Sequence, residues 1–194
     1  PFDRKDRVRY AAFYAQEQWT RGRMTLQGAV RYDRAWSYYP EQRVGPTRFL
    51  TEGLVFEHTE GVAGFNDITP RGGVAYDLFG NGKTSLKVNA GRYLEAAAAL
   101  GIYSAPNPVS RISTTASRTW TDNGNYVPDC DLLNPGAQDL RGSGGDFCAA
   151  LSDQNFGKPV FSNSIDPEIL SGWGVRSGDW QIGASIQQGV LPRV

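Results

Sequence analysis

The feature that most constrains this chain is an alternation of apolar and polar residues with a period of two. In residues 24–33, Leu26 and Val30 fall on one side of the chain, whereas Arg31 and Asp33 fall on the other. Such alternation is typical of β-strands whose two faces meet different environments. The pattern predicts an all-β chain with strands over residues 8–19, 24–35, 68–79, 84–94 and 179–191.

The connections between these segments are alternately short and long. Residues 20–23 and 80–83 form tight turns, and the second contains Asn81-Gly82, a strong hairpin signal. Residues 37–67 and 96–177 form long loops. This asymmetry is typical of outer-membrane β-barrels, and about ten residues per tilted strand cross a bilayer. We therefore predict an antiparallel transmembrane β-barrel segment of about five strands, with short periplasmic turns and long extracellular loops.

Composition excludes several other classes of protein. The 20 Lys and Arg residues balance the 20 Asp and Glu residues, which argues against a nucleic-acid partner. No apolar stretch reaches the ~20 residues of a membrane helix. The chain starts at Pro1 without an initiator Met or an apolar signal segment, and it ends at Val194. We therefore expect an internal piece of a longer protein.

The two faces of the predicted strands assign side chains to two environments. Charged residues are expected to face the lumen, where water or a plug domain tolerates them. These lumen-facing candidates are Arg31, Asp33, Arg71, Asp77 and Lys87. The lipid-facing candidates are Leu26, Val30, Val74, Leu86, Val88, Ile182 and Ile186. A soluble sheet that buries its apolar face would show the same alternation, so the loop asymmetry carries the distinction.

Aromatic residues lie toward both ends of the predicted strands. Trp19 and Phe79 lie beside the short turns, and Tyr32, Trp36 and Trp180 lie toward the long loops. We predict two interfacial girdles, because amphipathic rings are favoured at headgroup depth. The alternative is that Trp and Tyr are simply good strand formers.

Both cysteines, Cys130 and Cys148, lie in the longer loop. An even number within one surface loop predicts a disulfide and an oxidising compartment, and two unpaired thiols are the alternative. The region Trp120–Phe161 is the expected ligand-contact segment. We expect the long loops to be poorly defined and the sheet to be curved, with open edges.

The sequence contains no convincing catalytic, cofactor or metal motif. Gly82-Lys83-Thr84 resembles the end of a phosphate-binding loop, but Asp77 occupies the position of the first glycine and a hairpin follows. His58 and two cysteines do not supply four zinc ligands at a familiar spacing. Calcium remains an alternative for three loop acids, Asp122, Asp129 and Asp131, although their spacing is irregular. We predict no enzyme activity, no cofactor and no metal site.

Residues 14–19 (YAQEQW) and 26–33 (LQGAVRYD) are similar to the hairpin pattern Y-x-Q-D-x-W … L-x-L-x-x-G-x-R-Y-D. Residues 68–77, 82–84 and 91–93 resemble the hairpin that follows that pattern, and residues 127–135 and 172–180 resemble the next extracellular loop and strand. Taken in order, these stretches resemble the barrel of a TonB-dependent outer-membrane receptor of the Oar-like kind.

The resemblance implies a barrel of roughly 22 antiparallel strands with an N-terminal plug. In many such proteins the barrel follows a carboxypeptidase-regulatory-like domain. The implied location is the outer membrane of a Gram-negative bacterium. The implied partners are outer-membrane lipid, an unknown small-molecule or oligomeric ligand, and the inner-membrane TonB complex through an N-terminal region that this sequence does not contain.

Two other functions remain open from the sequence. A soluble β-sandwich module would bind carbohydrate on exposed Trp and Tyr rings, and it would need two sheets that share an apolar core. An outer-membrane adhesin or scaffold would have the same barrel without transport. The first hypothesis is a transporter that binds its ligand at the cell surface and imports it.

Overall fold

The computed structural model describes residues 3–160 and 164–190. The chain divides into two compact units. The strand unit comprises Arg7–Tyr38, Glu60–Ser104 and Asp166–Val194, and the loop unit comprises Pro1–Asp6, Tyr39–Thr59 and Ala105–Ile165. Across the described ranges, no helix is both long enough and apolar enough to cross a membrane.

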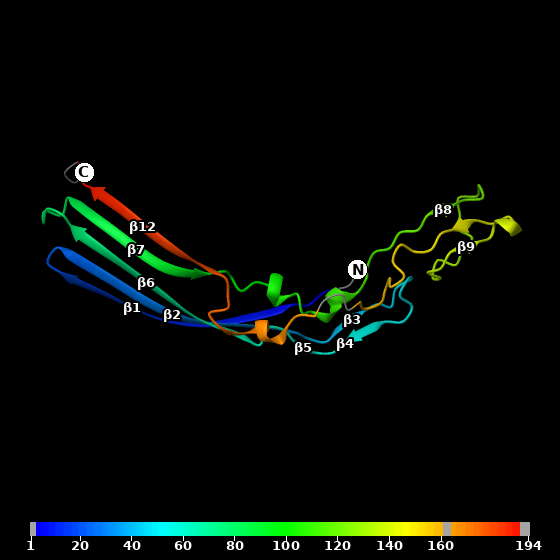
Figure 1. Cartoon of the computed structure of the whole chain (residues 1–194), viewed down its shortest axis with the longest axis horizontal. Helices are drawn as coiled ribbons and strands as arrows, with labels where there is room; N and C mark the ends of the chain where they lie inside the picture. The colour runs from blue at the N-terminus through cyan, green and yellow to red at the C-terminus, as the bar shows by residue number, and fades with distance from the viewer. Residues whose placement is uncertain (1–2, 161–163, 191–194) are drawn as a thin grey trace. The chain divides into compact units, whose positions relative to one another are not determined.

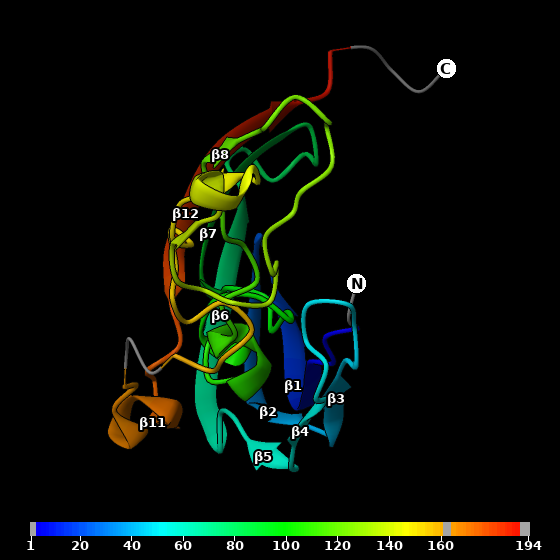
Figure 2. The ribbon, with the colours of Figure 1, turned by 90° about the vertical axis from the view of Figure 1, so that its right-hand side faces the viewer.

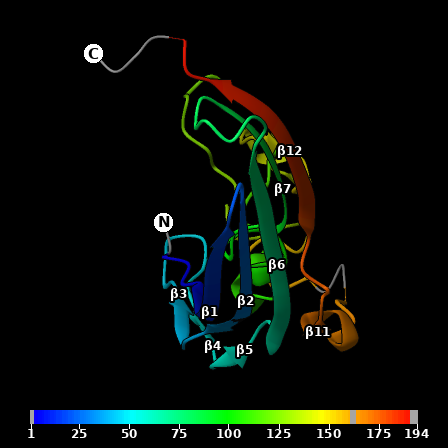
Figure 3. The ribbon, with the colours of Figure 1, turned by 90° about the vertical axis from the view of Figure 1, so that its left-hand side faces the viewer.

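Five long antiparallel strands form the main sheet of the strand unit (Figure 1). They are β1 (Arg7–Arg21), β2 (Met24–Tyr39), β6 (Gly64–Asp77), β7 (Thr84–Leu94) and β12 (Gly178–Gln188). They lie in the order β1-β2-β6-β7-β12, and Figure 3 shows the curvature of β12 at one edge. Two short strands extend this sheet: β5 (Thr59–Glu60) pairs with β2, and β11 (Ser171–Trp173) pairs in parallel with β6. The fold class is therefore all-β and antiparallel in its main strands, as the alternation predicts.

The strand register brings apolar side chains together across the whole sheet. Trp19, Leu26, Val74, Val88 and Ala184 are successive Cα partners from β1 to β12. Because side chains alternate between the faces of a strand, these residues lie on one face. The sequence pattern and the register thus define the same apolar face.

This apolar face is exposed rather than buried. Val30 is 48% exposed and Ile182 is 78% exposed. Within the described part of the strand unit, no second sheet packs against the main one. A β-sandwich would need such a sheet to cover the apolar residues. The arrangement therefore does not support the sandwich alternative.

Both tight turns depend on residues suited to them. Arg21 and Met24 are paired, so Gly22 and Arg23 alone connect β1 to β2, and Gly22 has a φ of 59° that favours glycine. Asp77 ends β6, and its carboxylate accepts backbone hydrogen bonds from Phe79 at 3.3 Å, Gly80 at 3.0 Å and Gly82 at 2.8 Å. Such bonds to nearby amides are a recurrent way in which aspartate holds a turn.

The strand boundaries differ from expectation mainly toward the long loops. β2 continues to Tyr39 and β6 starts at Gly64, because the ladder extends through the pairs Asp33–Asp67 and Ala35–Phe65. β6 ends at Asp77, so Phe79 lies in the turn. β12 ends at Gln188, and position 191 of the expected strand lies outside the described residues. The long connections therefore begin and end at different residues from those expected.

The long loops carry defined local structure, so the expectation of poorly defined loops is wrong. In the loop unit β3 (Gln42–Val44) pairs with β4 (Leu54–Phe56), side by side in Figure 2. The short strands β8 (Trp120–Thr121), β10 (Phe147–Cys148) and β9 (Gln138–Asp139) form a second small sheet. The 3-10 helices are η1 (Gly101–Tyr103), η2 (Pro108–Arg111), η3 (Arg141–Ser143) and η4 (Pro167–Leu170).

Each unit has its own small apolar core, which orders the loop segments within it. The core of the strand unit consists of Ala35, Val62, Phe65 and Tyr103, and that of the loop unit consists of Val44, Val109 and Ile112. Phe65 and Tyr103 meet edge to face with ring centroids 5.7 Å apart. Burial of these apolar side chains stabilises the folded loops, and the strand alternation does not predict this burial.

Candidate functional site on the polar face of the sheet

An ion pair between Arg31 and Asp33 is the first element of the site. Both residues lie on β2, two positions apart, and therefore on the same face. Arg31 Nε lies 3.0 Å and 2.9 Å from the two Asp33 oxygens, and Arg31 Nη2 lies 2.9 Å from Oδ1. This bidentate contact is the strong form of an arginine–carboxylate pair, so it fixes the Arg31 guanidinium in one orientation.

A second acid, Asp67, lies directly across the ladder from Asp33. Asp67 is fully buried, and neither of its carboxylate oxygens has a hydrogen-bond partner within the described residues. Like charges opposite each other on paired strands repel. Arg176, which precedes β12, offsets this charge, because its Nε lies 3.9 Å from Asp67 Oδ2. The Arg176 Nη2 group also donates a hydrogen bond to the Glu95 carbonyl at 3.0 Å.

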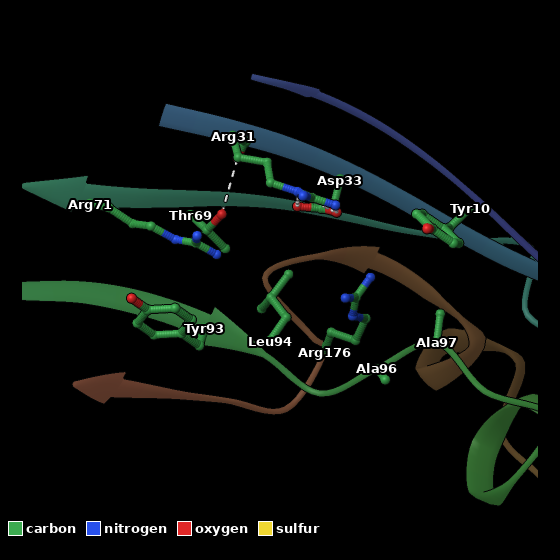
Figure 4. Close-up of a pocket in the computed structure, with 10 residues that line it drawn as sticks. All are labelled: Tyr10, Arg31, Asp33, Thr69, Arg71, Tyr93, Leu94, Ala96, Ala97 and Arg176. Carbon is green, nitrogen blue, oxygen red and sulfur yellow. Dashed lines mark hydrogen bonds and ion pairs between the residues drawn. The ribbon is translucent and has the colours of Figure 1, made fainter. Parts of the chain in front are cut away.

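Arg31, Asp33 and Arg176 border a cavity of about 320 Å³ on the polar face (Figure 4). Its lining consists of Tyr10, Arg31, Asp33, Thr69, Arg71, Tyr93, Leu94, Ala96, Ala97 and Arg176. Arg71 lies over the Tyr93 ring, 4.4 Å from its centroid, in a cation–π arrangement. Three arginines and one aspartate give the lining a net positive charge, which favours anionic groups.

The cavity brings together three of the five charged residues that were predicted to face the lumen. Arg31, Asp33 and Arg71 line it, whereas Asp77 and Lys87 do not. Asp77 holds the β6–β7 turn, and the Lys87 Nζ group donates to Gln187 Oε1 at 2.7 Å on the neighbouring strand β12. All five share the polar face by strand alternation, but Asp77 and Lys87 have local roles in the turn and the ladder.

A cluster of metal-ligating side chains is not found in the part of the chain that the structure describes. No group of three or more His, Cys, Asp or Glu side chains there is arranged to hold a metal ion. Of the three acids that were considered for calcium, Asp129 accepts from the Asn123 side chain at 2.9 Å, and the other two make turn contacts. Asp122 accepts from the Gly124 amide at 3.0 Å, and Asp131 accepts from the Leu133 amide at 2.9 Å.

Residues 1–166 match the family described as TonB dependent receptor-like, beta-barrel. The chain belongs to this family. No curated protein and no solved structure matches the chain. The family consists of outer-membrane receptors of Gram-negative bacteria that act as transporters and not as enzymes. The described strands form an open sheet, which is part of such a barrel and not a closed one.

The aromatic candidates of this TonB-dependent receptor segment lie on the apolar face or in a turn. Trp19 and Trp180 are large exposed side chains on the two edge strands, and Phe79 is exposed in the β6–β7 turn. The Tyr32 ring lies 5.9 Å from the Trp173 ring, and its hydroxyl donates to Asn66 Oδ1 at 2.7 Å. The Arg34 guanidinium lies 5.8 Å from the Trp36 ring centroid. The two-girdle assignment stays a prediction.

The longer loop of the receptor contains the disulfide Cys130–Cys148. Two residues before Cys148, the fully buried Asp146 accepts three hydrogen bonds, from Trp120 Nε1 at 2.8 Å, the Asn123 amide at 2.8 Å and the Asp129 amide at 3.0 Å. The bond from the Asp129 amide, and then those from Trp120 and Asn123, hold the pKa of Asp146 below its ordinary value of 3.8. Asp146 therefore connects its own part of the loop to residues 120–129.

Acid is expected to open this loop through Asp146. Because its pKa is lower in the folded loop, Asp146 stabilises the loop above the ordinary pKa and loses that effect as pH falls below about 4. Between pH 5 and pH 3, hydrogen exchange at the Asn123 and Asp129 amides should accelerate relative to exchange at the amides of β6. The acceleration should reach at most about tenfold per pH unit, the limit for protonation of one group. In Asp146→Asn, these two amides should already exchange faster at pH 5, and their exchange should no longer accelerate as the pH falls. A variant that keeps the acid step would contradict this role of Asp146.

Sequence reasoning missed Asp67 and Arg176, although both belong to the polar-face cluster. Asp67 lies two positions before Thr69 and four before Arg71, and therefore on the same face of β6. The predicted strand starts at residue 68, one residue too late to include Asp67. Arg176 lies outside any alternating segment, and only the return of the loop to β12 brings it to Asp67. No local signal in the sequence identifies Arg176.

Proposed function

We propose that this receptor segment belongs to a transporter that binds a ligand at the cell surface and imports it through a barrel lumen, energised by TonB. The observation that carries the proposal is a sheet with an exposed apolar face and a charged cavity on its opposite face. An apolar outer face suits lipid, and a polar inner face suits a lumen. Both long connections leave from the same ends of the strands, as surface loops do in these barrels.

In this proposal the polar-face cavity contacts the plug domain. Arg31 is paired with Asp33, but no described acid forms an ion pair with Arg71, which stacks on Tyr93 instead. An acidic side chain of a plug would complete that arrangement, because arginine pairs well with carboxylates. The ordered matches at residues 14–33 and 68–93 support the Oar-like subgroup within the family.

Surface exposure of the long loop is tested by trypsin treatment of intact cells. Arg141, whose side chain is 62% exposed in the longer loop, should be cleaved, whereas Arg23 and Lys83 in the short turns should be protected inside the cell envelope. Samples are reduced before mass spectrometry, because the disulfide would hold the cleaved loop together. Protection of Arg141 together with cleavage at Lys83 would reverse the orientation and contradict the proposal.

Import is tested separately from binding. Cells that produce the protein are incubated with a mixture of compounds from their growth medium, and depletion of each compound is followed by mass spectrometry. We expect at least one compound to be bound at the surface by all producing cells and internalised only by cells with an intact TonB complex. Surface binding with no TonB-dependent uptake would identify a non-transporting adhesin or scaffold instead.

A further inference from the structure

The loop unit contains a cavity of its own, of about 340 Å³. Most of its lining is apolar and comes from two aromatic rings and several aliphatic side chains. These residues are Phe49, Phe156, Leu132, Leu133, Leu151 and Pro135. Phe49 and Leu133 remain about half exposed, so the cavity is open to a ligand from outside. Small-molecule sites are commonly concave, mostly apolar and of this size.

Two cations also line this cavity, and no acid does. They are Arg118, which is half-buried, and Lys158, which is exposed. No described aspartate or glutamate forms an ion pair with either one. The Arg118 guanidinium donates only to backbone carbonyls, those of Asn134, Gly136 at 3.4 Å and Asp131 at 3.5 Å. Its Nε atom is buried without a hydrogen-bond partner. The positive charge in this apolar setting is therefore not neutralised by the protein.

The apolar surface continues past the two phenylalanine rings. Phe49 and Phe156 also line a neighbouring cavity of about 280 Å³, together with Val44, Leu50 and Ile112. The Arg48 guanidinium lies over Phe49, 5.4 Å from the ring centroid, which adds a third cation to the surroundings. An apolar ligand body larger than one cavity can therefore extend along the two rings.

We propose that this pair of cavities binds an apolar carboxylate, whose ring or acyl body lies against Phe49 and Phe156 and whose carboxylate lies between Arg118 and Lys158. The proposal rests on the proposed function, because it names the chemistry of the ligand that the surface loops would capture. Arg118 supplies a positive charge that its bonds to backbone carbonyls hold in place, and Lys158 supplies a mobile point charge beside it.

The lining favours this ligand class over an oligosaccharide. A sugar with many hydroxyls needs many polar partners, but the lining offers only one amide, that of Gln154, besides the two cations. The Gln154 amide nitrogen is already used, because it donates to the carbonyls of Leu151 at 3.0 Å and Pro135 at 3.1 Å. Charge complementarity and the apolar walls thus point to one anionic group on an apolar body.

The test uses naphthaleneacetate as the anionic probe and naphthaleneacetamide as its neutral counterpart. Equilibrium dialysis of the radiolabelled probes against outer-membrane vesicles that carry the protein measures affinity, and vesicles without the protein give the lipid background. We expect the anion to bind about fivefold more tightly than the neutral amide, in line with one or two partly exposed charge contacts. Equal affinity for the two probes would overturn the proposal.

Three variants locate the site. Lys158→Gln should weaken binding of the anion about threefold and leave the amide unchanged, since an exposed ion pair contributes modestly. Lys83→Gln, the matched change in a short turn, should alter neither. Phe49→Ala should weaken both probes, because it removes a shared apolar wall. An unchanged affinity of the anion in both Lys158→Gln and Phe49→Ala would overturn the assignment.

This binding assay is independent of transport. It is read from vesicles and requires neither TonB nor uptake. Selective binding of the anion in cells that show no TonB-dependent import would retain the ligand site and contradict only the transporter proposal. Import of a compound that is neither apolar nor anionic, with no selective probe binding, would retain the transporter and contradict the ligand class.

Discussion

Val30→Arg is expected to prevent most of the protein from inserting as a folded barrel. Val30 lies midway along β2 on the exposed apolar face, and its ladder partners are Ala15 and Pro70. Neither partner offers a carboxylate to an introduced guanidinium. An arginine on the lipid face near the bilayer midplane costs about 2–4 kcal/mol. The folded fraction in lipid vesicles, measured by heat-modifiable gel mobility, should fall at least about tenfold.

The matched change is Arg31→Glu, at the next residue and on the opposite face. It breaks the ion pair with Asp33, but the new carboxylate lies beside a cavity where Arg71 and Arg176 are present. Charge on this face is expected to be tolerated, so insertion should be spared much more than in Val30→Arg. Equal insertion defects in the two variants would remove the assignment of lumen and lipid faces.

Replacing both cysteines, Cys130→Ser with Cys148→Ser, is expected to destabilise the longer loop by about 3 kcal/mol. The disulfide closes a segment whose ends are 18 residues apart, and both cysteines are buried. Without the bond, the open loop gains conformational entropy, and the Asp146 contacts alone must hold Trp120, Asn123 and Asp129 in place. Amide exchange at Asn123 and Asp129 should accelerate roughly a hundredfold.

Reduction of the wild-type protein supplies the control for this double variant. Treatment with a thiol reductant should reproduce the accelerated exchange, whereas the amides of β2 and β6 should be unaffected, because they belong to the strand unit. An unchanged exchange rate in the loop, with the disulfide shown by mass spectrometry to be absent, would mean that hydrogen bonds alone hold the loop.

Local alternation was sufficient to find the sheet and its two faces. Every residue of the row Leu26–Val74–Val88 was placed on the apolar face from the sequence, and the register pairs the three across β2, β6 and β7. A period of two is a property of each strand by itself, so it can be read without knowing the neighbours. The disulfide could also be predicted from the sequence, because both cysteines lie in one loop.

Strand alternation did not predict correctly where strands with polar residues begin next to the long loops. Asn66 and Asp67 look like loop residues, yet β6 includes both because β2 supplies their ladder partners. Backbone pairing with a neighbouring strand can outweigh a low strand propensity of individual residues. The starting residue of β6, and with it the recognition of Asp67, depended on that pairing.

The order of the loops was likewise decided by distant contacts. Gly-, Asn- and Asp-rich stretches predict turns but not which segments meet. Asp146 collects Trp120, Asn123 and Asp129 from positions 17 to 26 residues earlier in the chain. A buried carboxylate is stable only when such donors are present, so its burial and the loop fold arise together.

The sequence by itself determined the all-β class, the positions of the five long strands and the division into an apolar and a polar face. Those features follow from side-chain alternation along single strands. Only the tertiary structure decided the pairing of β2 with the residues of β6 that precede Ile68. It also decided the ion pair of Arg176 with Asp67 and the cavities lined by Arg71 and Arg118. Each of these joins residues far apart in the chain, and such contacts form through burial and charge pairing that leave no periodic trace in the sequence.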